Sequence, residues 1–136
     1  MHVRGIRGAT TAGENTAEAI LSATRELLLE MVRQNGVELD EIAAVVFTCT
    51  DDLNAAFPAE ASRALGWTSV PLLTAREVDV PGGLPRCIRV LILWNTPRSQ
   101  EEVAHVYLRE AEALRPDLTR GARRVRGPLP LPPESR

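Results

Sequence analysis

The strongest constraint on the fold is a run of apolar residues with helical spacing near the N-terminus. Within residues 17–32, apolar side chains recur at three- and four-residue steps, which places them on one broad face of a helix. Asn15 or Thr16 suits the start of this helix, and Gly36 suits its end. We therefore predict one long amphipathic helix, with Thr24 as a weakly polar position in the middle of its apolar face.

Short apolar and β-branched runs separated by turn residues predict the strands of a sheet. The predicted strands span residues 3–9, 42–49, 70–73 and 87–94, of which the last is the strongest. Pro58 suits the first position of a short helix that Gly66 ends, and Ser99 with Glu102 resembles a capping box. The pattern leaves open whether residues 104–114 are helical or partly extended. These elements predict an α+β domain with a mixed sheet, one long helix and short helices.

The C-terminal end differs in composition from the rest of the chain. Residues 121–136 mix arginine with glycine and proline, and such a segment cannot bury a core. Up to Leu118 the chain has 11 arginines against 17 acidic residues, whereas beyond it 5 arginines stand against Glu134 alone. We predict one domain over residues 1–118 and an Arg- and Pro-rich extended tail over residues 119–136. An acidic body argues against nucleic acid as the main partner.

The sequence also lacks the signals of several other protein classes. No apolar run approaches the ~20 residues of a membrane helix, and no signal peptide precedes Val3. Cys49 and Cys87 stand singly in apolar runs, as structural thiols do in a reducing cytoplasm. His2 and His105 stand alone, and there is no phosphate loop, nucleophile elbow or metal-ligand cluster. We predict a cytoplasmic protein that uses no metal and no cofactor.

Arginine is the feature that points to chemistry, because all 16 basic residues are arginine. Any anion site must then consist of planar, permanently charged guanidinium groups. Alternation along residues 87–93 puts Arg89 on the same side as apolar neighbours, where it needs an anionic partner. Arg7 lies between Ile6 and Gly8, and the nearby glycines would admit a ligand or serve a bend. The pattern alone leaves open whether these arginines bind a ligand or form structural salt bridges.

Several segments resemble the AroH-class, Bacillus-type chorismate mutases in order and spacing, from about Val3 to Leu118. The resembling segments are residues 3–11 (VRGIRGATT), Phe57-Pro-Ala, Val70-Pro-Leu, Glu77, Gly82-Gly83-Leu84, residues 87–90 (CIRV), residues 105–108 (HVYL) and residues 114–118 (LRPDL). No single segment is specific, but the ordered set is. The resemblance implies an isomerase of phenylalanine and tyrosine biosynthesis that converts chorismate to prephenate without a cofactor.

The resemblance also implies roles for individual residues. Arg89 would direct its guanidinium group at the ether oxygen of chorismate, and Glu77 would accept the hydrogen bond of the ring hydroxyl. Arg7 and Tyr107 would bind a substrate carboxylate, so Arg89, Glu77 and Arg7 would be the catalytic residues. The other implied substrate contacts are Phe57 and Leu114 as apolar walls, Arg63 and Arg115 as positive charge near the mouth, and Leu73 and Thr74 as pocket lining.

Members of this family form trimers whose sheets surround a central core. The resemblance therefore implies a homotrimeric pseudo-barrel with active sites between subunits and no nucleic-acid or membrane partner. Two alternatives stay open at this point: a trimeric imine or enamine deaminase of the RidA-like type, and a non-catalytic trimer that binds a small molecule. The deaminase family also uses an interfacial arginine for a carboxylate, but it lacks the combination of CIRV with HVYL.

Overall fold

The computed structural model describes residues 1–114. In chain order the elements are β1 (His2–Thr11), α1 (Ala17–Asn35), β2 (Ile42–Cys49), α2 (Glu60–Ala64), β3 (Leu72–Arg76), β4 (Cys87–Thr96) and β5 (Val106–Tyr107). Short 3-10 helices lie at Leu39–Glu41, Gln100–Glu102 and Arg109–Ala113. Arg115 and the predicted tail over residues 119–136 lie outside the described residues.

The strands form one sheet in the order β3-β2-β4-β1-β5. β4 is antiparallel to its neighbours β2 and β1, whereas the edge strands β3 and β5 run parallel to β2 and β1. The N-terminal strand finds both partners far along the chain, since His2 lies opposite Thr96 and Gly8 lies opposite Val106. This is the predicted mixed sheet of an α+β domain.

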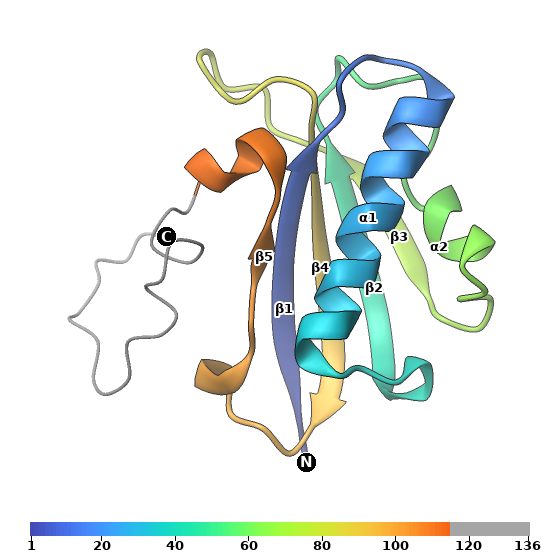
Figure 1. Cartoon of the computed structure of the whole chain (residues 1–136), viewed down its shortest axis with the longest axis vertical. Coiled ribbons are helices and arrows are strands. Elements are labelled where there is room, and N and C mark those ends of the chain that lie inside the picture. The colour runs from blue at the N-terminus through green and yellow to red at the C-terminus, as the bar shows by residue number, and fades with distance from the viewer. Residues whose placement is uncertain (115–136) are drawn as a thin grey trace.

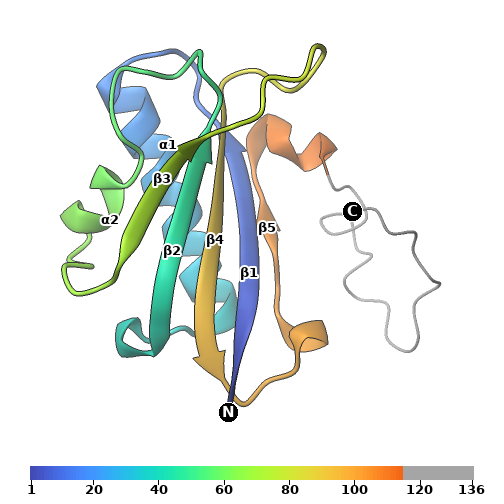
Figure 2. The same ribbon diagram turned by 180° about the vertical axis from the view of Figure 1, so that it is seen from behind.

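Within the described residues, helices cover only one face of the sheet. α1 crosses the centre of that face with α2 beside it (Figure 1), and the view from behind shows the opposite face with no helix in front of it (Figure 2). Successive side chains of each strand point to opposite faces of this sheet. Ile6 and Ile92 are fully buried beneath the helices, whereas Arg7 and Arg89 are exposed on the uncovered face.

Helix α1 confirms the strongest prediction from the sequence. Thr16 caps its start by accepting a hydrogen bond from the Ala19 N–H at 3.1 Å, and Gly36 ends it in the left-handed conformation, with φ of 69°. Thr24 is fully buried, and its hydroxyl donates to the Ile20 carbonyl at 2.7 Å. The polar position in the apolar face is therefore satisfied within the helix. The large apolar side chains that α1 buries are Ile20, Leu27, Leu28 and Met31.

The strand predicted at residues 70–73 lies two residues later, because β3 begins at Leu72 and runs to Arg76. Pro71 has no N–H to donate to a strand ladder, so pairing with β2 starts at Leu72 opposite Val45. The Pro71 carbonyl still accepts the Val45 N–H at 2.9 Å. Val70 is instead buried in the main apolar core.

The other predicted boundaries lie closer to those of the structure. α2 begins at Glu60, because Pro58 lies in the preceding turn, where its carbonyl accepts the Ala61 N–H at 3.0 Å. The predicted capping box is present, with the Ser99 N–H donating to Glu102 at 2.9 Å. The undecided segment is extended in β5 and helical in the 3-10 helix after it. No helix within residues 1–114 is both long enough and apolar enough to cross a membrane.

Gly8→Ala should destabilise the fold, because Gly8 lies where β1 meets α1. A methyl group there would meet the thioether end of Met31 and a methyl group of Leu27. Overpacking of this kind costs about 1–3 kcal/mol, and we expect a fall of that size in the free energy of unfolding. Urea unfolding at fixed protein concentration measures it. Gly13→Ala is the control, because a Cβ there meets nothing within 4 Å. Equal midpoints for the two variants would contradict the close approach.

Candidate active site

Arg89 meets a carboxylate on the uncovered face of the sheet. Its Nε lies 3.0 Å from Oε2 of Glu77, the residue that follows β3. The register of β2 against β4 places Thr48 opposite Arg89, and the Thr48 hydroxyl donates to the same Glu77 oxygen. The Glu77 N–H donates to the Cys49 carbonyl at 2.9 Å, which fixes the start of the loop after β3. Three elements therefore hold one cation and one anion in contact.

The exposure of the pair indicates which group can meet a ligand. The Arg89 side chain is 47% exposed, whereas the Glu77 side chain is only 18% exposed. Exposed ion pairs contribute little stability, so this contact alone does not explain an arginine between apolar neighbours. The sequence left a salt bridge and a ligand site as alternatives for Arg89. The structure contains the salt bridge and still leaves nearly half of the arginine open to solvent.

Arg89 borders two open hollows. One, of about 280 Å³, is bordered by Arg7, Tyr107 and Arg89 over a floor that includes Val46 and Leu91. The other, of about 390 Å³, lies toward Glu77 and the loop over residues 78–85. Pockets for small molecules usually enclose about 300–1,000 Å³, so the hollow beside Tyr107 falls just below this range and the hollow beside Glu77 lies near its lower end. The residues that line the two hollows with Arg89 are both polar and apolar.

Arg7 and Tyr107 come to the first hollow from adjacent strands. Tyr107 lies opposite Ala9 in the parallel pairing of β1 with β5, and it is 6% exposed. The backbone N–H of Arg7 donates to Nδ1 of His105 at 2.9 Å. Leu114 packs against the small cluster that contains Tyr107 and Ala9. The structure therefore brings Arg7, Tyr107, Arg89 and Glu77 together, with Leu114 packed against the cluster that contains Tyr107.

Other predicted contacts lie elsewhere in the chain. Phe57, Arg63, Leu73 and Thr74 border neither hollow. They belong to the α2 and β3 side of the molecule, across the sheet from β5. Phe57 and Leu73 are 65% and 63% exposed, which is unusual for large apolar side chains. Arg115 lies outside the described residues, so its role stays a prediction.

Thr48 is the residue that the sequence interpretation missed. Alternation along residues 42–49 places Thr48 on the same side as Val46, away from the buried Phe47. The one signal in the sequence was a hydroxyl at the end of an otherwise apolar strand face. This hydroxyl could be assigned to the site only from the register of β2 against β4, which the sequence does not reveal.

The cysteines beside the site are not poised for nucleophilic chemistry. Burial raises the pKa of the Cys87 thiol to about 11, although the nearby Arg89 partly opposes this effect. Burial also raises the pKa of Cys49. Both thiols are therefore protonated near neutral pH, and the thiol is the unreactive form. Within residues 1–114, no three His, Cys, Asp or Glu residues are grouped so as to hold a metal ion.

Comparisons with known proteins point to one family. Residues 3–118 match the sequence model of the family described as chorismate mutase type I. The chain is 65% identical over 117 residues to the chorismate mutase AroH of Thermus thermophilus, which covers 85% of this chain and 96% of that protein. It is 43% identical over 120 residues to the chorismate mutase AroH of Bacillus subtilis, with 88% and 94% covered. The solved chorismate mutase from Clostridium thermocellum superimposes with a TM-score of 0.79 at 50% identity, over 80% of this chain and 97% of that one.

Thr48→Val should lower kcat with chorismate, because it leaves Glu77 with Arg89 but without the hydroxyl that donates to it. Loss of one hydrogen bond to a charged group corresponds to about a tenfold decrease. Thr48→Ser keeps the hydroxyl and should stay close to the wild type. Steady-state kinetics on the three proteins measure the difference. A valine variant with wild-type kcat would show that Thr48 has no part in holding Glu77.

Proposed function

This chain belongs to the chorismate mutase type I family, and from that membership we propose how its side chains carry out the reaction. The protein is a chorismate mutase, an isomerase of aromatic amino acid biosynthesis. We propose that it rearranges chorismate to prephenate through orientation and fixed charge, with no covalent and no acid–base step. The observation that carries this proposal is the half-exposed Arg89, paired with Glu77 and beside Arg7 and Tyr107.

The rearrangement breaks a carbon–oxygen bond and forms a carbon–carbon bond within one molecule. Nothing has to be protonated, attacked or oxidised. A protein can lower the barrier by holding the substrate folded, with its side chain over the ring. It can also stabilise the charge that develops because bond breaking runs ahead of bond making. Both contributions require fixed polar groups rather than reactive ones.

Arg89 and Glu77 supply the fixed charges in this proposal. The Arg89 guanidinium group stabilises the ether oxygen as it becomes negative. Glu77 accepts a hydrogen bond from the ring hydroxyl and complements the ring as it becomes electron-poor. Their contact, with the Thr48 hydroxyl on the same carboxylate, supports the proposal because both charges are in place before the substrate arrives. Charges held in advance need little reorganisation in the transition state.

Arg7 and Tyr107 hold the substrate in the proposed complex. They border the same hollow from β1 and β5, with Leu114 packed beside Tyr107. We propose that both bind one carboxylate of chorismate, for which a permanently charged planar fork is better suited than a lysine. The clamp keeps the substrate in its folded conformation over Arg89.

We propose that the protein is a homotrimer with sites between chains, arranged as a pseudo-barrel of sheets. The predicted contacts Phe57, Arg63, Leu73 and Thr74 lie at the opposite edge of the sheet from Tyr107. A closed head-to-tail ring would place that edge beside the Arg7 and Tyr107 of the next chain. It would also bury the exposed Phe57 and Leu73. In this assembly Arg63 and Arg115 add positive charge near the mouth.

We also propose that residues 1–118 form the catalytic domain and that residues 119–136 lie outside it, since the family match ends at residue 118. A cytoplasmic location is supported by Cys49 and Cys87, which are free thiols, as is usual in a reducing compartment.

Replacement of Arg89 is the direct test of the mechanism. Arg89→Ala and Arg89→Lys should each lower kcat by about 10²–10³, because an ammonium group cannot reproduce the fork. The assay follows the loss of chorismate absorbance, with circular dichroism as the check on folding. Arg33→Lys is the matched control, because Arg33 pairs only with Glu30 of its own helix among the contacts of the described residues. An Arg89→Lys enzyme with nearly wild-type kcat would rule out the assigned role.

A mechanism without proton transfer should give a kcat that does not change from roughly pH 6 to 9. A general acid–base pair would instead give a bell-shaped pH profile. Guanidinium groups stay charged throughout this range. Heavy water should slow turnover only through its viscosity. The measurement is kcat at saturating chorismate in overlapping buffers. A bell near neutrality together with a large solvent isotope effect would instead favour proton transfer, as the deaminase alternative requires.

The assembly can be tested with two inactive variants. Light scattering should give the mass of a trimer for Arg7→Ala and for Arg63→Ala, and each variant alone should bind chorismate weakly. When the two are unfolded and refolded together in equal amounts, about a quarter of the sites should contain both arginines, because each mixed ring has one intact interface. Activity should return to a corresponding fraction. No recovery on mixing would place both arginines in the same chain's site.

A further inference from the structure

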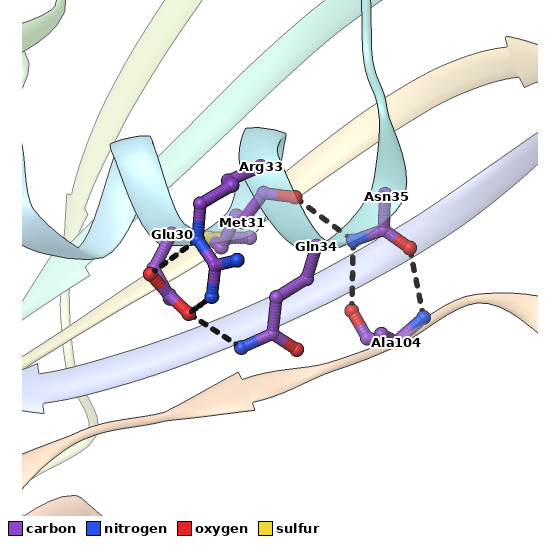
Figure 3. A network of polar contacts seen from close by, with 6 residues as sticks. All are labelled: Glu30, Met31, Arg33, Gln34, Asn35 and Ala104. Carbon is purple, nitrogen blue, oxygen red and sulfur yellow. Dashed lines mark hydrogen bonds and ion pairs between the residues drawn. The ribbon is translucent and has the colours of Figure 1, made fainter.

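Asn35, the last residue of α1, uses its whole side-chain amide to hold a distant part of the chain. Its Oδ1 accepts the Ala104 N–H at 2.8 Å, and its Nδ2 donates to the Ala104 carbonyl and to the Met31 carbonyl, both at 2.9 Å. The residue is 1% exposed. Figure 3 shows the two parallel contacts between Asn35 and Ala104, which we call the Asn35–Ala104 clamp.

The clamp makes the contacts that a neighbouring strand would otherwise make. One residue that both donates to and accepts from the same backbone residue reproduces a hydrogen-bonded pair of an antiparallel ladder. β5 needs such support because it is only two residues long: Val106 pairs with Gly8 and Tyr107 pairs with Ala9 of β1. The clamp lies at the start of this segment, and the Leu108 N–H donates to the Ala9 carbonyl at its end.

Ending the helix does not require these two contacts. The N–H groups of Gly36 and Val37 already donate to the Val32 carbonyl, at 2.8 and 3.2 Å. The bond from Asn35 to Met31 stays within α1, whereas the bonds to Ala104 span 69 residues of sequence. The clamp therefore serves the placement of β5 rather than the termination of α1.

The clamped segment carries the groups that would bind the substrate. His105 follows Ala104 directly, and its Nδ1 accepts the backbone N–H of Arg7 at 2.9 Å. Tyr107 lies two residues further on and borders the hollow shared with Arg7. We propose that Asn35 is a positioning residue, which sets the spacing between Arg7 and Tyr107 at that of a single carboxylate. This inference rests on the proposed function, which assigns the two side chains to a carboxylate of chorismate.

Asn35→Ala should therefore raise KM by about tenfold, the effect of one weakened hydrogen bond to a charged group, and should change kcat much less. Arg89 and Glu77 belong to β4 and to the end of β3, which the clamp does not touch. Thr24→Ala is the matched control: it removes another fully buried hydrogen-bonding side chain of α1 that has no bond to β5. A merely structural role would make the two variants alike in KM.

A double variant tests whether Asn35 affects KM through Tyr107. If Asn35 acts through Tyr107, Asn35→Ala combined with Tyr107→Phe should raise KM by much less than the product of the single effects. If KM of the double variant rises by the full product of the two single effects, the two residues act independently. That result would overturn the positioning role and leave the proposed function intact. If Tyr107→Phe and Arg7→Ala themselves leave KM unchanged, the carboxylate assignment fails, and the inference fails with it.

Asn35→Asp tests the positioning role of Asn35 if the Asn35→Ala variant does not fold. It keeps the shape and the acceptor for the Ala104 N–H but cannot donate to the Ala104 carbonyl. KM should again rise, and amide hydrogen exchange should become faster at Ala104 and at Arg7 but not at Phe47 in β2. Unchanged exchange at Arg7, or an unchanged KM, would overturn the proposal.

Discussion

The packing of α1 on the centre of the sheet decides where every functional side chain can lie. Side chains alternate along a strand, so burying Ile6 and Val90 beneath α1 sends Arg7 and Arg89 to the uncovered face. A shift of register by one residue would place guanidinium groups in the apolar core without counter-charges. Gly8 allows the close approach of helix and strand that fixes this choice. The hydrophobic core thereby sets the geometry of the site on the other side of the sheet.

The charges around the site suit an anionic substrate in an otherwise acidic protein. Up to Leu118 the sequence carries 17 acidic residues against 11 arginines, yet Arg7 and Arg89 both border the hollow beside Tyr107. Glu77 offsets one of these charges and is held by Thr48. The site combines a local positive excess with one fixed carboxylate, which suits the developing charges of the mechanism that we propose.

Local elements could be predicted from the sequence because their signals are local. Thr16, Gly36 and the apolar spacing between them defined α1, and the run over residues 42–49 coincides with β2. The order of the strands has no such signal, and Pro71 displaced the start of β3. Strand alternation singled out Arg89, whereas family resemblance supplied its role and Glu77, and the structure brings the two residues into contact.

Two polar residues show why the rest of the site escaped prediction. Thr48 carries no charge that would mark it, and its contact with Glu77 follows only from the pairing of β2 with β4. The sequence presents Asn35 merely as the residue before a helix-ending glycine. Its partner Ala104 is 69 residues away, and only the folded chain brings the two together.

The pairing of β1 with late strands has a consequence for how the protein is made. β1 is synthesised before α1 and β2, but its neighbours β4 and β5 are among the last elements of the described residues. Until residues near 107 have emerged, α1 and β2 have no completed sheet on which to bury their apolar faces. Such non-local pairing slows folding and exposes apolar surface during synthesis. The sheet can therefore close only after β4 and β5 have been synthesised, so the early elements β1, α1 and β2 depend on late ones for their burial.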